Sequence, residues 1–123
     1  FDHVVYGGDE NFYLLDWRQD FAGSNVGDVY YDLAKMYGGI LMSYKLMKDE
    51  SNFSCFIDKN VVSYKYESEP ALEKFKPIYE KWITNNGYDL DKVKLITALI
   101  FLNMSPLHEK EFGNMLFAKA SAI

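Results

Sequence analysis

Residues 12–17 read Phe-Tyr-Leu-Leu-Asp-Trp, and residues 27–34 read Gly-Asp-Val-Tyr-Tyr-Asp-Leu-Ala. The first stretch is typical of an apolar strand that ends in a carboxylate. The second is typical of a helix whose N-cap is Asp28, with Asp32 one turn further on. Carboxylates arranged in this way could hold a divalent cation against a phosphate and brace the loop around it. Taken alone, Asp16 could equally cap a turn after the strand.

The flanking residues predict where this stretch sits in the chain. Residues 2–6 and 12–16 are short apolar runs on either side of a turn-rich segment, which predicts a β-hairpin. A loop over residues 17–27 then leads into a helix that should extend to about Lys48. Its apolar residues recur every three or four positions and predict one buried stripe: Val29, Leu33, Met36, Tyr37, Ile40, Leu41, Tyr44 and Met47. For Gly38-Gly39 we favour close helix packing over a functional kink.

A second hairpin and three further helices are expected downstream. Residues 53–66 alternate around a turn at residues 58–60. A helix should begin at Pro70, and Pro77 should either kink it or divide it in two. Residues 85–87, Asn-Asn-Gly, predict its end.

Asp89 or Asp91 should cap the next helix, which is apolar nearly all round and is therefore expected in the centre of the core. Ser105-Pro106 should break it, and a last helix should begin near Glu109. The fold class expected for residues 1–123 is a single mainly helical α+β domain with small hairpins.

Composition excludes several classes of protein. The net charge is −5 and no block of like charges occurs, which argues against a nucleic-acid partner. No apolar stretch reaches the roughly 18 residues of a membrane span, so no membrane partner is expected. Cys55 is the single cysteine, which rules out an internal disulfide and fits a reducing, cytoplasmic compartment.

Residues 14–17 and 27–34 resemble the aminoglycoside phosphotransferase and choline kinase group of small-molecule kinases, which share the protein-kinase-like fold. In that group, "His-x-Asp, four residues, Asn" precedes a hairpin, then "Ile-Asp-Trp/Phe", then "Gly-Asp-x-x-x-Asp-Leu-Ala". Residues 102–108, Leu-Asn-Met-Ser-Pro-Leu-His, look like a bacterial branch linked to surface-polysaccharide synthesis. The resemblance implies the helical C-terminal lobe of an enzyme that uses ATP and Mg²⁺ to phosphorylate a hydroxyl of a small acceptor. The N-terminal lobe and the His-x-Asp base are expected upstream of Phe1.

The resemblance also implies roles for individual residues. Asp16 matches the aspartate that holds Mg²⁺ on the ATP phosphates, and Asp32 matches the buried aspartate that braces the catalytic loop. Asp28 is expected mainly to cap the helix and, in addition, to support the site. His3 stands where the family has the second metal ligand, an Asn. Imidazole is a poorer ligand for Mg²⁺ than the amide oxygen of an Asn. Either His3 has lost the ligand role, or it binds the ion through water, or the match to the family is shifted by one residue.

Four further residues are candidates for contact with the acceptor substrate. Trp17 and Arg18 follow the metal aspartate, although Arg18 could instead pair with a nearby carboxylate, Asp20 or Asp28. Asn103 and His108 lie at the predicted helix break, where capping of the helix ends is the competing interpretation.

Two other functions remain open. His3 at the position of the expected Asn would suit a pseudokinase, and the helices alone would suit a binding or interaction module. The absence of the other lobe would also leave apolar surface uncovered, which predicts a homodimer.

Overall fold

The computed structural model describes residues 4–15, 23–24, 26–42, 53–59, 61–66, 69–107 and 110–123. These ranges contain two antiparallel hairpins, β1 (Val4–Tyr6) with β2 (Phe12–Leu14) and β3 (Phe53–Asp58) with β4 (Val61–Tyr66). They also contain α1 (Val29–Leu41), α3 (Pro70–Asn85), α4 (Leu90–Met104), a 3₁₀ turn η2 (Ser105–Leu107) and α5 (Lys110–Ala122). The predicted mainly helical α+β class is confirmed; the kinase-like lobe stays a prediction.

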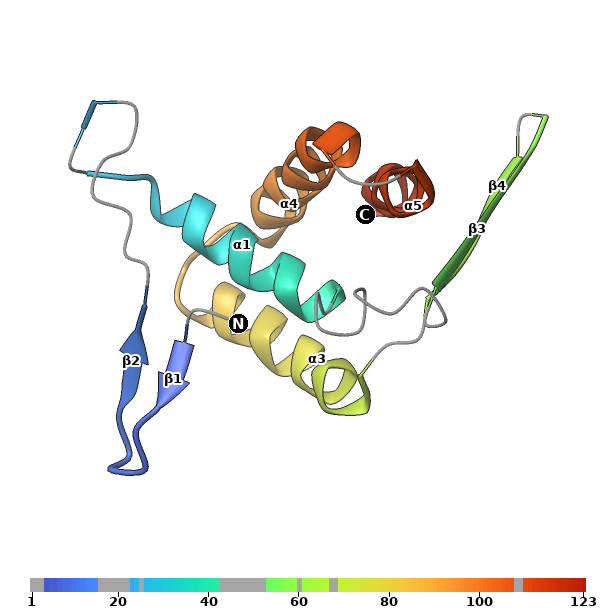
Figure 1. The fold of residues 1–123 in the computed structure, drawn as a ribbon. Helices are drawn as coiled ribbons and strands as arrows, with labels where there is room; N and C mark the ends of the chain where they lie inside the picture. Colours follow the sequence, from blue (N-terminus) through green and yellow to red (C-terminus); the bar gives the residue numbers. More distant parts are fainter. Residues whose placement is uncertain are drawn as a thin grey trace.

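Helices α1 and α4 form the centre of the helical part. Helix α1 contacts α4 on one side and α3 on another, and α4 also packs against α5 and more weakly against α3 (Figure 1). Asp28 caps α1 as predicted, because its Oδ1 accepts a hydrogen bond from the Tyr30 amide at 2.9 Å. The fold therefore fixes the start of the helix that carries Asp32.

The buried side chains form two clusters. One joins α1, α3 and the start of α4: Leu33, Tyr37, Ile40, Tyr79, Ile83 and Val93. The other joins the end of α1 to α4 and α5: Met42, Phe101, Met115, Leu116 and Ala120. Leu41 packs against both clusters, so the end of α1 connects the two parts of the core.

Helix α1 is shorter than predicted. The expectation that it reaches Lys48 is wrong, because the helix ends at Leu41 and Met42 adopts an extended conformation with φ −142° and ψ 114°. Gly38-Gly39 weakens the last turn, and leaving the helix places the Met42 side chain, 1 % exposed, in the second cluster. Tyr44 and Met47 lie outside the described residues.

The predicted close packing at Gly38 is confirmed. A Cβ on Gly38 would lie 3.2 Å from Cε1 of Phe101, which is tighter than ordinary contact. Phe101 is itself buried between α4 and α5. The glycine therefore lets α1 approach α4 where a larger residue would press on a buried ring.

The predicted central position of α4 is confirmed by its contacts with α1, α3 and α5, but the helix is not buried on all sides. Val93, Thr97 and Phe101 form its buried face, but Leu95 is 61 % and Leu99 54 % exposed. Among the described residues, α1, α3 and α5 pack on it and leave this leucine face uncovered. A helix with apolar residues on all sides is therefore not necessarily covered by other elements on all sides.

Helix α3 is continuous through Pro77, so the predicted alternative of two short helices is wrong. Pro70 lies at its start, and the helix ends at Asn85 before Gly87, whose φ is +79°. Asp89, rather than Asp91, caps α4 by accepting hydrogen bonds from the amides of Asp91 and Lys92. None of the described helices is long and apolar enough to cross a membrane.

The β1–β2 hairpin differs from the helices in burial. Its register pairs Val4 with Leu14 and Tyr6 with Phe12. Asp9 organises the turn: its Oδ1 accepts from the Asn11 amide at 3.2 Å, and its Oδ2 accepts from the Tyr13 hydroxyl at 2.7 Å. Every residue of both strands is exposed. The second hairpin, in contrast, contacts α5.

Candidate functional site

Five predicted site residues lie outside the described residues: His3, Asp16, Trp17, Arg18 and His108. The structure therefore gives neither their separations nor their surroundings. What it does provide is the strand that leads toward Asp16 and the helix that follows the loop. Leu15 is the last described residue after β2.

Asp32, predicted to support the site, lies on the first turn of α1. The family resemblance implies a buried carboxylate, but Asp32 is exposed. Within the part of the chain that the structure describes, its carboxylate forms no hydrogen bond or ion pair. Asp32 is therefore accessible to a ligand or to another polypeptide segment.

Asn103 is an exposed residue near the end of α4. The C-cap of that helix is Ser105, so Asn103 does not cap the end of α4. Ser105 instead donates its hydroxyl to the Gly113 carbonyl at 2.6 Å, which ties the end of α4 to α5. Asn103 remains a candidate for substrate contact with no competing cap role.

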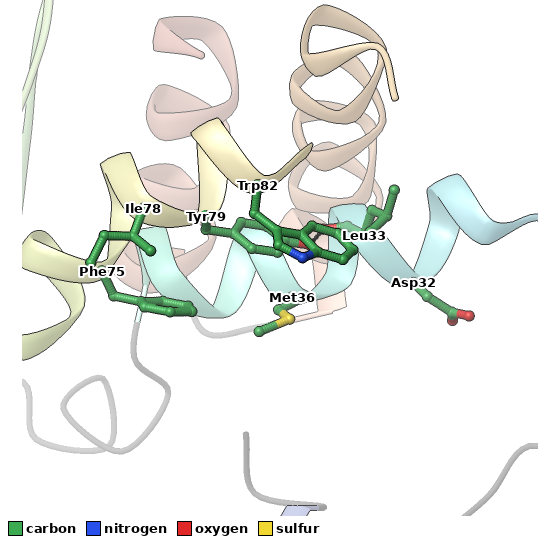
Figure 2. Close-up of a pocket in the computed structure, with 7 residues that line it drawn as sticks. All are labelled: Asp32, Leu33, Met36, Phe75, Ile78, Tyr79 and Trp82. Atoms are coloured by element: carbon green, nitrogen blue, oxygen red, sulfur yellow. Dashed lines mark hydrogen bonds between the residues drawn. The ribbon is translucent and has the colours of Figure 1, made fainter. Parts of the chain in front are cut away.

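A groove lies between α1 and α3 (Figure 2). Its volume is about 350 Å³, within the range of small-ligand sites. Its lining is almost wholly apolar: Asp32, Leu33, Met36, Phe75, Ile78, Tyr79 and Trp82. Figure 2 shows Asp32 at one end, with its carboxylate directed away from the aromatic rings.

The α3 side of the groove is built from stacked rings. Phe75 and Tyr79 lie 6.1 Å apart between ring centroids, and Tyr79 and Trp82 lie 6.1 Å apart with an interplanar angle of 5°. Their spacing of three or four residues places them on one helix face. Trp82 is 48 % and Ile78 61 % exposed, so this face offers apolar surface to something outside it.

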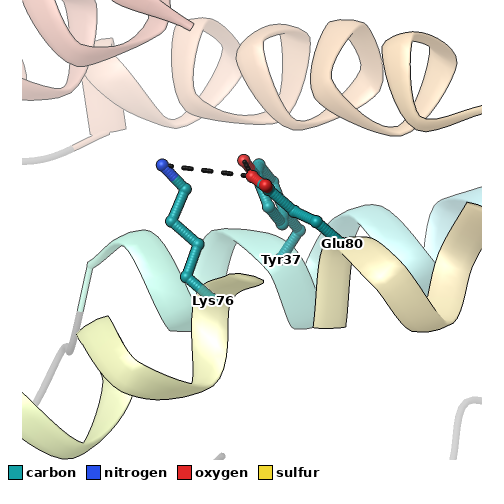
Figure 3. Close-up of polar contacts among 3 residues, drawn as sticks. All are labelled: Tyr37, Lys76 and Glu80. Atoms are coloured by element: carbon teal, nitrogen blue, oxygen red, sulfur yellow. Dashed lines mark hydrogen bonds and ion pairs between the residues drawn. The ribbon is translucent and has the colours of Figure 1, made fainter. Parts of the chain in front are cut away.

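Buried polar contacts hold the two walls together. The Tyr79 hydroxyl donates to the Leu33 carbonyl at 3.0 Å, and the Tyr37 hydroxyl donates to Glu80 Oε1 at 2.7 Å (Figure 3). Lys76 lies 4.0 Å from the same carboxylate oxygen. Burial raises the pKa of Tyr79 to about 12 and, with the Glu80 contact, raises the pKa of Tyr37 further. Both phenols therefore stay neutral donors at physiological pH, and their hydrogen bonds join α3 to α1.

Sequence reasoning missed the groove. Val29 and Met36 were assigned to the buried stripe of α1, but they are 44 % and 39 % exposed, and that part of the prediction is wrong. The stripe is wider than the surface that α3 and α4 cover. The three-to-four spacing of Phe75, Ile78, Tyr79 and Trp82 could have revealed an apolar face on α3, although not that the face lacks cover.

No group of three or more potential metal-ligating side chains occurs within residues 4–15, 23–24, 26–42, 53–59, 61–66, 69–107 and 110–123. Comparison with known proteins adds no relative: no protein-family description, curated protein or solved structure matches the chain significantly.

Proposed function

We propose that this chain is part of an ATP-dependent small-molecule phosphotransferase, corresponding to the C-terminal lobe of a kinase-like fold. The observation that supports the proposal is the order of elements around Asp16. The β1–β2 hairpin leads toward this aspartate, and after the loop α1 begins at the Asp28 cap with Asp32 exposed on its first turn. This is the order in which the family places its metal aspartate and its supporting aspartate.

In this proposal each residue has a distinct task. Asp16 supplies a carboxylate ligand, which suits Mg²⁺, and the bound ion would neutralise charge on the phosphates of ATP. Asp28 fixes the first turn of α1, and the exposed Asp32 carboxylate accepts hydrogen bonds from the backbone of a neighbouring loop. Trp17, Arg18, Asn103 and His108 would contact the acceptor, whose hydroxyl loses its proton to a base outside this chain. Dependence on ATP places the protein in the cytoplasm.

The test is a phosphoryl-transfer assay on the complete gene product. Radiolabelled ATP is offered with a panel of sugars, amino alcohols, aminoglycosides and nucleosides. Asp16→Asn should lower transfer by about 10²–10³-fold, as the loss of one key electrostatic contact does in other enzymes. Asp9→Asn is the matched control, because Asp9 is a carboxylate on the same hairpin whose contacts are confined to the turn. Equal activity of Asp16→Asn and the parent protein would refute the proposal.

A second candidate function, a binding module without catalysis, is favoured by the groove. An apolar face of this kind is typical of protein interaction surfaces. The two functions separate cleanly, because Asp16→Asn would leave a binding module unaffected while substitutions in the groove would impair it.

A further inference from the structure

Two exposed apolar surfaces of this chain complement one another. The first is the groove between α1 and α3, concave and lined by aromatic and aliphatic side chains. The second is the β1–β2 hairpin, on which Phe12 is 70 %, Tyr6 58 % and Leu14 58 % exposed. One surface is a hollow and the other is a projection, so each could cover the other.

The hairpin needs a partner for its own stability. An isolated two-stranded hairpin is at best marginally stable in water and normally requires packing against another element. The β1–β2 register places apolar residues on both faces, and all of them are exposed. No helix makes more than a weak contact with either strand among the described residues (Figure 1).

The hairpin tip and the α3 edge of the groove carry opposite charges. Asp9 and Glu10 lie at the exposed tip of the hairpin. Lys74 and Lys81 are exposed on α3 and flank Ile78 at spacings of four and three residues, so they border the α3 side of the groove. The charged residue that lines the groove itself, Asp32, is acidic and lies at one end (Figure 2). An acidic tip would therefore suit the α3 edge and not the end that Asp32 occupies.

From these observations we propose that the protein forms a symmetric homodimer in which the β1–β2 hairpin of each copy packs into the α1–α3 groove of the other. Such an arrangement is isologous: the same two surfaces are used twice, and the assembly closes at two copies. The Phe12 side of each hairpin covers Ile78 and Trp82 of the second copy, and the hairpin tip lies beside Lys74 and Lys81.

Sedimentation equilibrium of the purified chain tests the proposal. The parent protein should sediment as a dimer. Phe12→Asp in the hairpin and Ile78→Asp in the groove should each weaken dimerisation by at least about tenfold, which corresponds to 1.4 kcal/mol. Both residues are mostly exposed, so circular dichroism should show unchanged helix content. Leu99→Asp is the matched control: this leucine is 54 % exposed on α4, outside both surfaces, and its loss should leave the dimer intact.

Mixing the two weakened variants gives a further check. A Phe12→Asp chain retains a good groove, and an Ile78→Asp chain retains a good hairpin. Their heterodimer has one intact contact and one contact that carries both substitutions, so additive losses place its affinity between those of the two homodimers. A monomeric parent, a dimer unaffected by both substitutions, or loss of the dimer in Leu99→Asp would each overturn the proposal.

The charged rim gives an independent check. Glu10→Lys and Lys81→Glu should each weaken the dimer severalfold, and the double variant should recover most of the loss. Additive losses without recovery would contradict the placement of the hairpin tip. The dimer does not depend on phosphoryl transfer, because Asp16→Asn in the complete gene product should lower transfer by about 10²–10³-fold and leave sedimentation unchanged.

Discussion

The helical body and the β1–β2 hairpin both carry large apolar side chains, but only the helical body buries a set of them. In the body, Tyr37 is 2 % and Phe101 1 % exposed, while in the hairpin Phe12 is 70 % exposed. The helices cover one another around α1, whereas the hairpin has no such cover from the described helices. The comparison shows that apolar patterning indicates which face of an element favours burial, but not which other surface supplies it.

The largest expected difference between the two regions is in the free energy of unfolding lost when one aromatic ring is removed from each. Phe101→Ala should lower the free energy of unfolding by about 3–5 kcal/mol, because it leaves a cavity between α4 and α5. Phe12→Ala, measured at concentrations low enough to favour the monomer, should change it by less than about 0.5 kcal/mol. Urea unfolding monitored by circular dichroism gives both values. Similar losses for the two variants would mean that the hairpin packs against its own helices.

A smaller effect is expected from adding one methyl group. Gly38→Ala gains about 1 kcal/mol in helix propensity, but its Cβ would press on Phe101 at 3.2 Å, and overpacking costs about 1–3 kcal/mol. We therefore expect a net destabilisation of about 1 kcal/mol, reversed in a Phe101→Leu background. In the hairpin, Gly8→Ala has open space but a φ of +76°, so it should loosen the turn without moving the urea midpoint of the helices.

The smallest effect concerns the hydroxyl groups of one tyrosine in each region. Tyr79 has a folded-state pKa raised to about 12, so its contribution to stability is complete below pH 10 and is lost as the pH rises toward 12. Tyr79→Phe should cost about 1 kcal/mol at neutral pH and flatten this alkaline loss. Tyr13→Phe, which removes an exposed hairpin contact to Asp9, should do neither. Urea midpoints between pH 8 and pH 11.5 provide the measurement.

Local signals in the sequence were sufficient for most elements of the fold. The Asp28 cap, the choice of Asp89 or Asp91 for the α4 cap, the break at Ser105-Pro106 and the stop near Gly87 were predictable, because each acts through hydrogen bonds or dihedral angles within a few residues. Both hairpins were also predicted from their turns. These features do not depend on what lies across the core.

Errors arose where a distant contact decides the outcome. Helix α1 ends at Leu41, where Met42 is buried against α4 and α5, and Gly38-Gly39 alone does not specify that end. Leu95 and Leu99 on α4 are exposed because no described element covers them. The groove was missed for the same reason, since it depends on the separation of α1 and α3. For the candidate site, the sequence predicted the Asp28 cap, while the roles of Asp16 and its neighbours stay predictions.

The position of Leu41 has a consequence for how the protein opens. This residue packs against the cluster shared with α3 and against the cluster shared with α5. Fraying of the last turn of α1 would therefore loosen both clusters at once, although α3 and α5 belong to different ones. The four helices should consequently behave as one cooperative unit in amide hydrogen exchange, with the hairpin tip as a separate, low-energy opening.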